Sequence, residues 1–225
     1  MEPTLTLEHI PPGQFPEWLF SQLCEQVVDP RLEPILVIHS SDAARAEILH
    51  RLESANIGPI DRSRHHTLSS LRKSLHADLR LPRLLPLNAN GHRLLHVECE
   101  LAAKRGEFPL LHPNSEHRWG EGRTRALTRL TQAFDIEDIR NWDGPGLAGF
   151  RNCLKRMGRE LNGLHPLVHR RTLIDRLEEI ESIPFTLTGI AGIVLMDQLP
   201  TLSKSNRRLL LNLNRFKDLH QLCQH

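Results

Sequence analysis

Tyrosine is absent from the sequence, and the aromatic residues amount to seven phenylalanines and three tryptophans among 225 residues. Proteins that hold single-stranded nucleic acid without reading its sequence commonly stack the bases on aromatic side chains. The composition argues against a stacking platform of that kind. Any binding to nucleic acid would then depend on basic and hydroxyl side chains.

Cysteine is scarce as well. The four cysteines, Cys24, Cys99, Cys153 and Cys223, lie far apart and form no CxxC pair. A disulfide framework and a zinc knuckle are both recognised by characteristic cysteine spacings, so neither is indicated. We expect free, mostly buried thiols.

The sequence has no long apolar run. The longest extends roughly from Gly189 to Met196, far short of the ~20 residues that a helix needs to cross a bilayer. The N-terminal segment MEPTLTLEHI lacks the basic region and apolar stretch of a secretory signal. We therefore expect a cytoplasmic protein that does not bind a membrane.

Histidine is abundant, with fourteen residues, and this raises the question of a metal site. The best arrangement is His92 and His96, four positions apart in an expected helix, with Glu100 one turn later. Because no HExxH motif or equivalent accompanies them, the sequence predicts no metal site.

The net charge of +2 conceals a segregation of charge along the chain. Residues 1–61 contain three Lys or Arg and ten Asp or Glu, whereas residues 62–83 contain six and one. Residues 151–171 contain six and one, and residues 202–225 contain five and one. Basic stretches that converge in space would attract phosphate groups, because clustered Lys and Arg displace counterions from a polyanion. Separate, solvent-exposed helix faces are the simpler interpretation.

Strand-like segments occur towards both ends of the chain, at residues 4–10, 34–41, 184–197 and, more weakly, 217–223. Segments with helical spacing follow the first three of them, and a further helix begins at Thr67. Strands that are joined through helices favour a parallel sheet.

The middle of the chain has only helical patterns, at residues 92–105, 122–134, 146–161 and 166–181. The sequence therefore predicts an α/β fold with a mainly parallel sheet and a helical insertion. The expected divisions are a first α/β part over residues 1–88, the insertion over residues 89–183 and a second α/β part over residues 184–225.

Three strand-to-helix segments, taken in order, resemble the first RecA-like domain of superfamily 1 helicases, the group that includes the UvrD, RecB and AddB proteins. ILVIHSSDAARAEILHRL resembles the segment after the second strand of that domain, and HHTLSSLRKSL resembles the next, which touches DNA. IVLMDQLPTLSKSNRRLLLNL resembles its third segment, the Walker B strand and the helix that follows. The resemblance implies a sheet of the P-loop NTPase type with a helical insertion where that family has its own.

The phosphate-binding loop departs from the family. In GxxxxGKS or GxxxxGKT, backbone N–H groups hold phosphates, the lysine reaches the β- and γ-phosphates, and the hydroxyl holds magnesium. The corresponding loop, HIPPGQFPEW, keeps Gly13 but has Gln14 in place of the lysine and Phe15 in place of the hydroxyl. The resemblance therefore implies that ATP and magnesium binding is lost, and no cofactor is expected.

A second departure falls at the end of the third segment. Asp197 stands where the family holds magnesium, but Gln198 replaces the glutamate that positions the attacking water. An amide cannot take a proton, so the site is expected to be inactive and Asp197 to be a relic of a Walker B carboxylate.

Degenerate helicase domains of this sort resemble AddB and RecC-like subunits, which bind and route DNA in helicase–nuclease complexes for repair and recombination. The resemblance implies a catalytically inactive scaffold that contacts single-stranded or unwinding DNA through Ser40, Ser41, His66, Thr67, Arg72 and Lys73. The implied partner is a helicase or nuclease subunit, or a downstream domain of a longer protein. Ser41 and Thr67 are equally well explained as helix caps, and His66 as a turn residue like its neighbour His65.

Other functions remain open. His39 and His65 each begin an H-x-S/T pattern found in two-histidine phosphoesterases, but a separation of 26 residues leaves too little chain for the two lobes of such enzymes. The amphipathic segments 149–161 and 165–180 would suit a helical protein-interaction adaptor. Residual helicase activity would require a distorted site that still binds ATP.

Overall fold

The computed structural model describes residues 3–11, 15–29, 31–56, 58–86, 88–114, 116–133, 147–196 and 202–224. The chain divides into two compact units. The sheet unit comprises Met1–Leu79, Leu177–Leu202 and Asn206–His225, and the helical unit comprises Arg80–Arg176 with Ser203–Ser205. The sequence placed the two main divisions after residues 88 and 183, whereas the units divide after Leu79 and Arg176.

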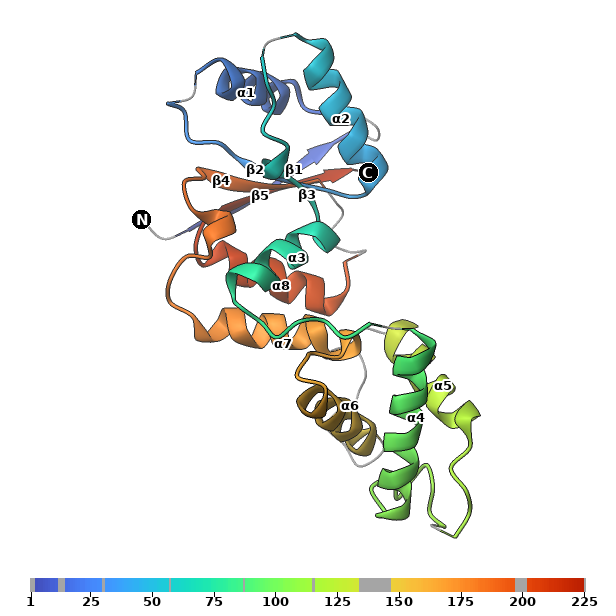
Figure 1. Cartoon of the computed structure of the whole chain (residues 1–225). Coiled ribbons are helices and arrows are strands. Elements are labelled where there is room, and N and C mark those ends of the chain that lie inside the picture. Colours follow the sequence, from blue (N-terminus) through green and yellow to red (C-terminus); the bar gives the residue numbers. More distant parts are fainter. Residues whose placement is uncertain are drawn as a thin grey trace. The chain divides into compact units, whose positions relative to one another are not determined.

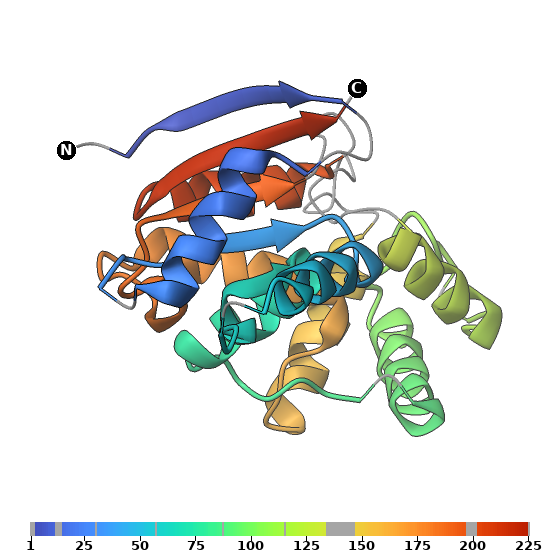
Figure 2. The same cartoon turned by 90° about the horizontal axis from the view of Figure 1, so that it is seen from above.

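Among the described residues, five strands form one sheet in the order β1-β5-β4-β2-β3, and every neighbouring pair is parallel. Figure 2 shows β1, from the start of the chain, beside β5, from its end. The predicted α/β class and mainly parallel sheet are confirmed, and the weak last strand lies inside the sheet. The strands are β1 (Leu5–Ile10), β2 (Leu36–His39), β3 (His65–Thr67), β4 (Gly192–Met196) and β5 (Asp218–Gln224).

Helices cover both faces of this sheet (Figure 1). One face carries α1 (Glu17–Val28) and α2 (Asp42–Ser54), and the other carries α3 (Leu68–Asp78) and α8 (Lys204–Asn214). Two short 3-10 helices, η1 (Arg62–Arg64) and η2 (Phe185–Leu187), precede β3 and β4. The helices therefore alternate with the strands, as parallel pairing requires.

The core between the sheet and α1 and α2 follows directly from the sequence pattern. Leu19 and Leu23 are one helical turn apart in α1 and bury the same face, while all four residues of β2 are buried. A strand covered on both sides reads as a continuous apolar run, which explains the composition of β2. The buried cluster on this face is Ile10, Phe15, Leu19, Leu23, Ile35, Val37, Ile48, Leu52, Val194 and Leu222.

The helical unit contains α4 (Ala89–Lys104), α5 (Glu121–Ala133) and α6 (Ala148–Glu160), and α7 (Pro166–Glu179) leads from it into the sheet unit. α4 and α6 pack across a core in which the rings of Phe108 and Trp119 are stacked, with centroids 4.3 Å apart. A Cβ atom at Gly149 would lie 2.2 Å from the carbonyl oxygen of Glu107. Only glycine therefore allows α6 to begin this close to the segment after α4.

Candidate functional site at the carboxyl edge of the sheet

The segments that follow β2 and β3 meet at one edge of the sheet. β2 and β3 are parallel neighbours, and the last residue of β2, His39, is paired with the last residue of β3, Thr67. Each strand leads almost directly into a helix, α2 from Asp42 and α3 from Leu68. Two helix N-termini, each carrying a partial positive charge, therefore lie at the same edge.

Ser41 caps α2. Its Oγ accepts a hydrogen bond from the Ala44 N–H at 3.1 Å, and its extended backbone ends the strand segment. The neighbouring Ser40 is exposed. Of the two predicted serine contacts, Ser41 already has a structural role, while the hydroxyl of Ser40 faces solvent.

Thr67 forms a capping box with Ser70 at the start of α3. Thr67 Oγ1 accepts from the Ser70 N–H at 3.4 Å, and Ser70 Oγ accepts from the Thr67 N–H at 2.9 Å. Thr67 is buried in β3. Its hydroxyl is therefore explained by helix capping, as the sequence allowed.

His66 is not a turn residue. It lies in β3 and is buried, with its Nδ1 3.3 Å from Ser70 Oγ and its Nε2 without a hydrogen-bond partner among the described residues. Pairing of β3 with β2 draws the His-His-Thr segment into the sheet, which overrides the turn expected from its sequence. His66 is accordingly too enclosed to serve as a surface contact for DNA.

His39 and His65 form a buried pair between β2 and β3. The His39 Nε2 and His65 Nδ1 atoms are 3.0 Å apart, and the stacked rings have centroids separated by 5.3 Å. The His39 side chain is 1% exposed and that of His65 is 4% exposed. The two histidines thus meet although their spacing gave no reason to expect it, but each ring is bonded to the other and closed off from a substrate.

Burial keeps this pair neutral. It lowers the pKa of His39 to about 3, with the neighbouring His65 acting in the same direction. It also lowers the pKa of His65 to about 4, although Asp61 partly opposes that change. One neutral ring donates to the other, so the pair stabilises the contact between β2 and β3.

Arg72 and Lys73 differ although they are adjacent in α3. Arg72 is half-buried and donates from its guanidinium to Asn206 Oδ1 of α8. Lys73 is exposed, and none of the described residues forms a hydrogen bond or an ion pair with it. Arg72 therefore joins two helices on one face of the sheet, whereas the charge of Lys73 is available to a ligand.

Gly13, Gln14, Asp197 and Gln198 of the degenerate nucleotide site lie outside the described residues. Phe15 is described and belongs to the buried core, where its ring meets that of Phe20 edge to face at a centroid distance of 6.4 Å. The position at which the resemblance implies a magnesium-binding hydroxyl is therefore occupied by an apolar side chain that packs against α1.

A basic groove that the sequence patterns did not predict lies between α4 and α5 in the helical unit. It has a volume of about 820 Å³ and is lined by Ala89, His92, Arg93, His96, Val97, Glu121, Arg125, Thr128 and Arg129. Glu121 pairs with Arg125 at 2.8 Å, and no ion pair of Arg93 or Arg129 occurs within the described ranges. A count of charge by segment misses the groove, because its arginines come from two helices separated by a loop.

His92 and His96 lie in this groove beside arginines, and the one carboxylate in its described lining, Glu121, is paired with Arg125. Glu100 instead pairs with Lys104 at 3.5 Å. In the described part of the chain, no group of three His, Cys, Asp or Glu side chains is arranged to hold a metal ion.

Comparison with known proteins adds no assignment. Neither the family models nor the curated protein sequences give a match to this chain. Across the described ranges, every helix is too short or too polar to span a bilayer.

Proposed function

We propose that this chain is a nucleic-acid-binding scaffold built on a RecA-like sheet of the helicase type, with a phosphate site that no longer hydrolyses nucleotide. Its ligand is single-stranded or unwinding DNA, and its context is a helicase–nuclease assembly in DNA repair or recombination. The proposal rests on the resemblance of three segments and on the arrangement of the sheet that carries them.

The observation that carries the proposal is the convergence of the segments after β2 and β3 at one edge of a parallel sheet. Ligands of open α/β sheets bind outside the carboxyl ends of the strands, where neighbouring strands lead to opposite faces. β2 leads to α2 on one face, whereas its two neighbours β3 and β4 lead to α3 and α8 on the other (Figure 1). Ser40 follows β2 at this point, which favours a ligand at the same edge.

The strand that precedes Asp197 lies beside the strand that precedes Ser40. Met196, the last residue of β4, is paired with His39 of β2 and with Leu222 of β5. Asp197 directly follows Met196 in the sequence, as Ser40 follows His39. In the sequence, Asp197 and Ser40 thus each directly follow one of two neighbouring strands.

The basic groove between α4 and α5 supports the same ligand class. Arg93 and Arg129 present guanidinium groups without described acidic partners, and such groups bind phosphate oxygens in a planar, two-point geometry. Binding at this groove would follow the phosphate backbone, so it would not need the aromatic platform that the composition lacks.

A titration of single-stranded oligonucleotides against salt tests the proposal. We expect the logarithm of the affinity to fall linearly with the logarithm of salt concentration, with a slope of about −0.7 for each phosphate contact. Lys73→Glu should weaken binding and reduce the slope, because it reverses an exposed charge beside the proposed edge. Absent binding, or binding that does not change with salt, would refute the scaffold.

Lys217→Glu provides the matched control. Lys217 directly precedes β5, so the same charge reversal falls at the amino edge of the sheet. It should leave the slope nearly unchanged, whereas equal effects of the two substitutions would show that only net charge matters.

A helical interaction adaptor is the second candidate, and one observation favours it. Leu94, Val97 and Leu101 of α4 are 49%, 52% and 44% exposed, and their spacing places them on one side of the helix. An exposed apolar stripe of this kind is a common docking surface. The same titration separates the candidates, because an adaptor has no salt-dependent affinity for DNA.

A further inference from the structure

We propose that the helical unit contains a binding site for a small phosphate ester of about mononucleotide size, in the groove between α6 and α7. This α6–α7 groove has a volume of about 850 Å³, which lies in the range of small-molecule sites. Its polar wall is formed by Asn152, Lys155, Arg156, Arg159, Asn162, His165 and Thr172.

The α6 wall carries two available cations. Asn152, Lys155 and Arg159 are three and four positions apart, so they share one side of α6, while the opposite side buries Phe150 and Met157. Lys155 and Arg159 are exposed, and neither forms an ion pair within the described ranges.

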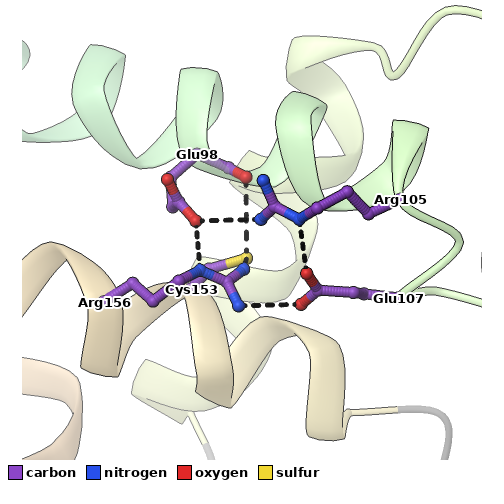
Figure 3. A network of polar contacts seen from close by, with 5 residues as sticks. All are labelled: Glu98, Arg105, Glu107, Cys153 and Arg156. Carbon is purple, nitrogen blue, oxygen red and sulfur yellow. Dashed lines mark hydrogen bonds and ion pairs between the residues drawn. The ribbon is translucent and has the colours of Figure 1, made fainter.

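Arg156 also lines the groove, but its charge is already compensated. Its Nε is 2.5 Å from Glu98 Oε1 and its Nη1 is 2.9 Å from Glu107 Oε2 (Figure 3). Arg156 therefore fixes the position of α6 against the end of α4. A ligand would be recognised by Lys155 and Arg159 on either side of it.

His165 adds a neutral donor to the opposite wall. The His165 ring is 3% exposed, and its Nδ1 accepts a hydrogen bond from the Leu167 N–H at 3.3 Å. Burial, with nearby His92 acting in the same direction, lowers the pKa of His165 to about 4. The neutral ring then carries its proton on Nε2, for which no described residue provides an acceptor.

The hydrogen-bond donors and positive charges of the groove lining favour an anionic ligand with oxygen acceptors. None of the described residues that line the groove has a carboxylate, whereas the side chains of Lys155, Arg159 and His165 can all donate hydrogen bonds. Two cations one turn apart suit a dianionic phosphate, which accepts several charge-assisted hydrogen bonds. A bare phosphate would fill little of about 850 Å³, so the remaining space points to a larger body attached to it.

The apolar wall and the base of the groove would hold that body. Pro82, Leu154, Leu164 and Val168 form the apolar part of the lining. The Leu164 N–H donates to the Arg83 carbonyl at 2.8 Å, and the Leu85 N–H donates to the Leu164 carbonyl at 2.9 Å. These backbone bonds form the base before any ligand arrives, which lowers the entropic cost of binding.

Gly163 is required for this base. A Cβ atom at Gly163 would lie 2.4 Å from Leu85 Cδ2 and 2.9 Å from the Arg83 carbonyl oxygen. Since no larger residue fits without moving the segment, the close approach at this end of the groove depends on glycine.

Calorimetric titration of the full chain with AMP, adenosine and inorganic phosphate tests the site. We expect AMP to bind, adenosine to bind at least tenfold more weakly because it lacks the phosphate, and inorganic phosphate to compete with AMP. The double variant Lys155→Met with Arg159→Met should lose tenfold or more in affinity for AMP while retaining its fold, because both side chains are exposed.

Three controls make the result decisive. Lys104→Met removes a cation elsewhere in the helical unit and should leave AMP binding unchanged. Lys73→Glu and Asp197→Ala should also leave it unchanged, so this site and the proposed DNA-binding function can fail independently. Equal affinity for AMP and adenosine, no binding of AMP at millimolar concentration, or full binding by the double variant would overturn the proposal.

Discussion

Arg156 is the side chain whose removal should most clearly weaken the helical unit. Its guanidinium holds Glu98 and Glu107 at 2.5 Å and 2.9 Å, and Arg105 holds the same two carboxylates from the other side at 3.3 Å and 2.7 Å (Figure 3). The four residues form a closed ring of alternating charge between α4, the segment after it and α6. Arg156→Met keeps the aliphatic stem and removes the charge.

The magnitude follows from burial and from what remains after the substitution. The Arg156, Glu98 and Glu107 side chains are 24%, 12% and 23% exposed, between the limits of a surface pair and a fully buried one. Breaking a buried pair costs about 3–5 kcal/mol, and losing an exposed one costs about 0–1 kcal/mol. Because Arg105 still compensates part of the charge, we expect a loss of about 2 kcal/mol in the free energy of unfolding.

Thermal and urea unfolding at neutral pH measure this loss. For a chain of this size, about 2 kcal/mol corresponds to a decrease in Tm of about 4–8 °C. Arg105→Met is the matched control, because that side chain is 48% exposed and should cost less than half as much. Equal stability of Arg156→Met and the unaltered chain, or a larger effect of Arg105→Met, would refute the reasoning.

The same variant has a signature in its pH dependence. Burial alone would raise the pKa of Glu107, but hydrogen bonds from Arg105 and Arg156 lower it below the ordinary 4.5. A carboxylate with a lowered pKa contributes stability above that ordinary value, and this contribution is lost as pH falls through the lowered pKa. Between pH 5 and pH 3, the free energy of unfolding of Arg156→Met should therefore fall less than that of the unaltered chain. An equal fall in both proteins would contradict the assigned contacts.

Two further predictions concern buried geometry. Burial lowers the pKa values of His39 and His65 from 6.5 to about 3 and about 4, so unfolding below about pH 6.5 takes up protons and the free energy of unfolding falls as the pH drops. His39→Leu should reduce this pH dependence by about one proton, which urea unfolding at a series of pH values measures. Gly149→Ala should lower the free energy of unfolding by about 2–3 kcal/mol, because the added methyl group would lie 2.2 Å from the Glu107 carbonyl oxygen. At Gly122 an added methyl group would meet no atom of the described residues within 4 Å, so Gly122→Ala should raise the stability measured by calorimetry by up to about 1 kcal/mol.

Local patterns predicted the sheet well. The β-branched run at β2 and the spacing of Leu19 and Leu23 in α1 depend on neighbours in the sequence, and both elements occur where expected. Even the weak last strand is present as β5, where its leucines at 219 and 222 are buried. These elements could be predicted because one buried face imposes a fixed period on the chain.

The contacts within the candidate site could not be predicted in the same way. The His39–His65 pair depends on which residue of β3 stands opposite which residue of β2, and this register is set by tertiary packing. The bond from Arg72 to Asn206 joins helices 134 positions apart. In the sequence, Phe15 stood out only because it replaces the hydroxyl residue of the phosphate-binding loop. Its burial could not be predicted, since its packing partners come from α1 and from the core around it.

The position of β5 has a consequence for how the chain can fold while it is being synthesised. β1 has β5 as its only neighbour in the described sheet, and the Thr4 N–H donates to Asp218 Oδ1 across 214 positions of sequence. A ribosome therefore releases the first strand long before the strand that separates it from β4 exists. Until that late segment emerges, β1 is wholly unpaired and β4 has an open edge, and a chaperone or a wrong strand can bind at these sites.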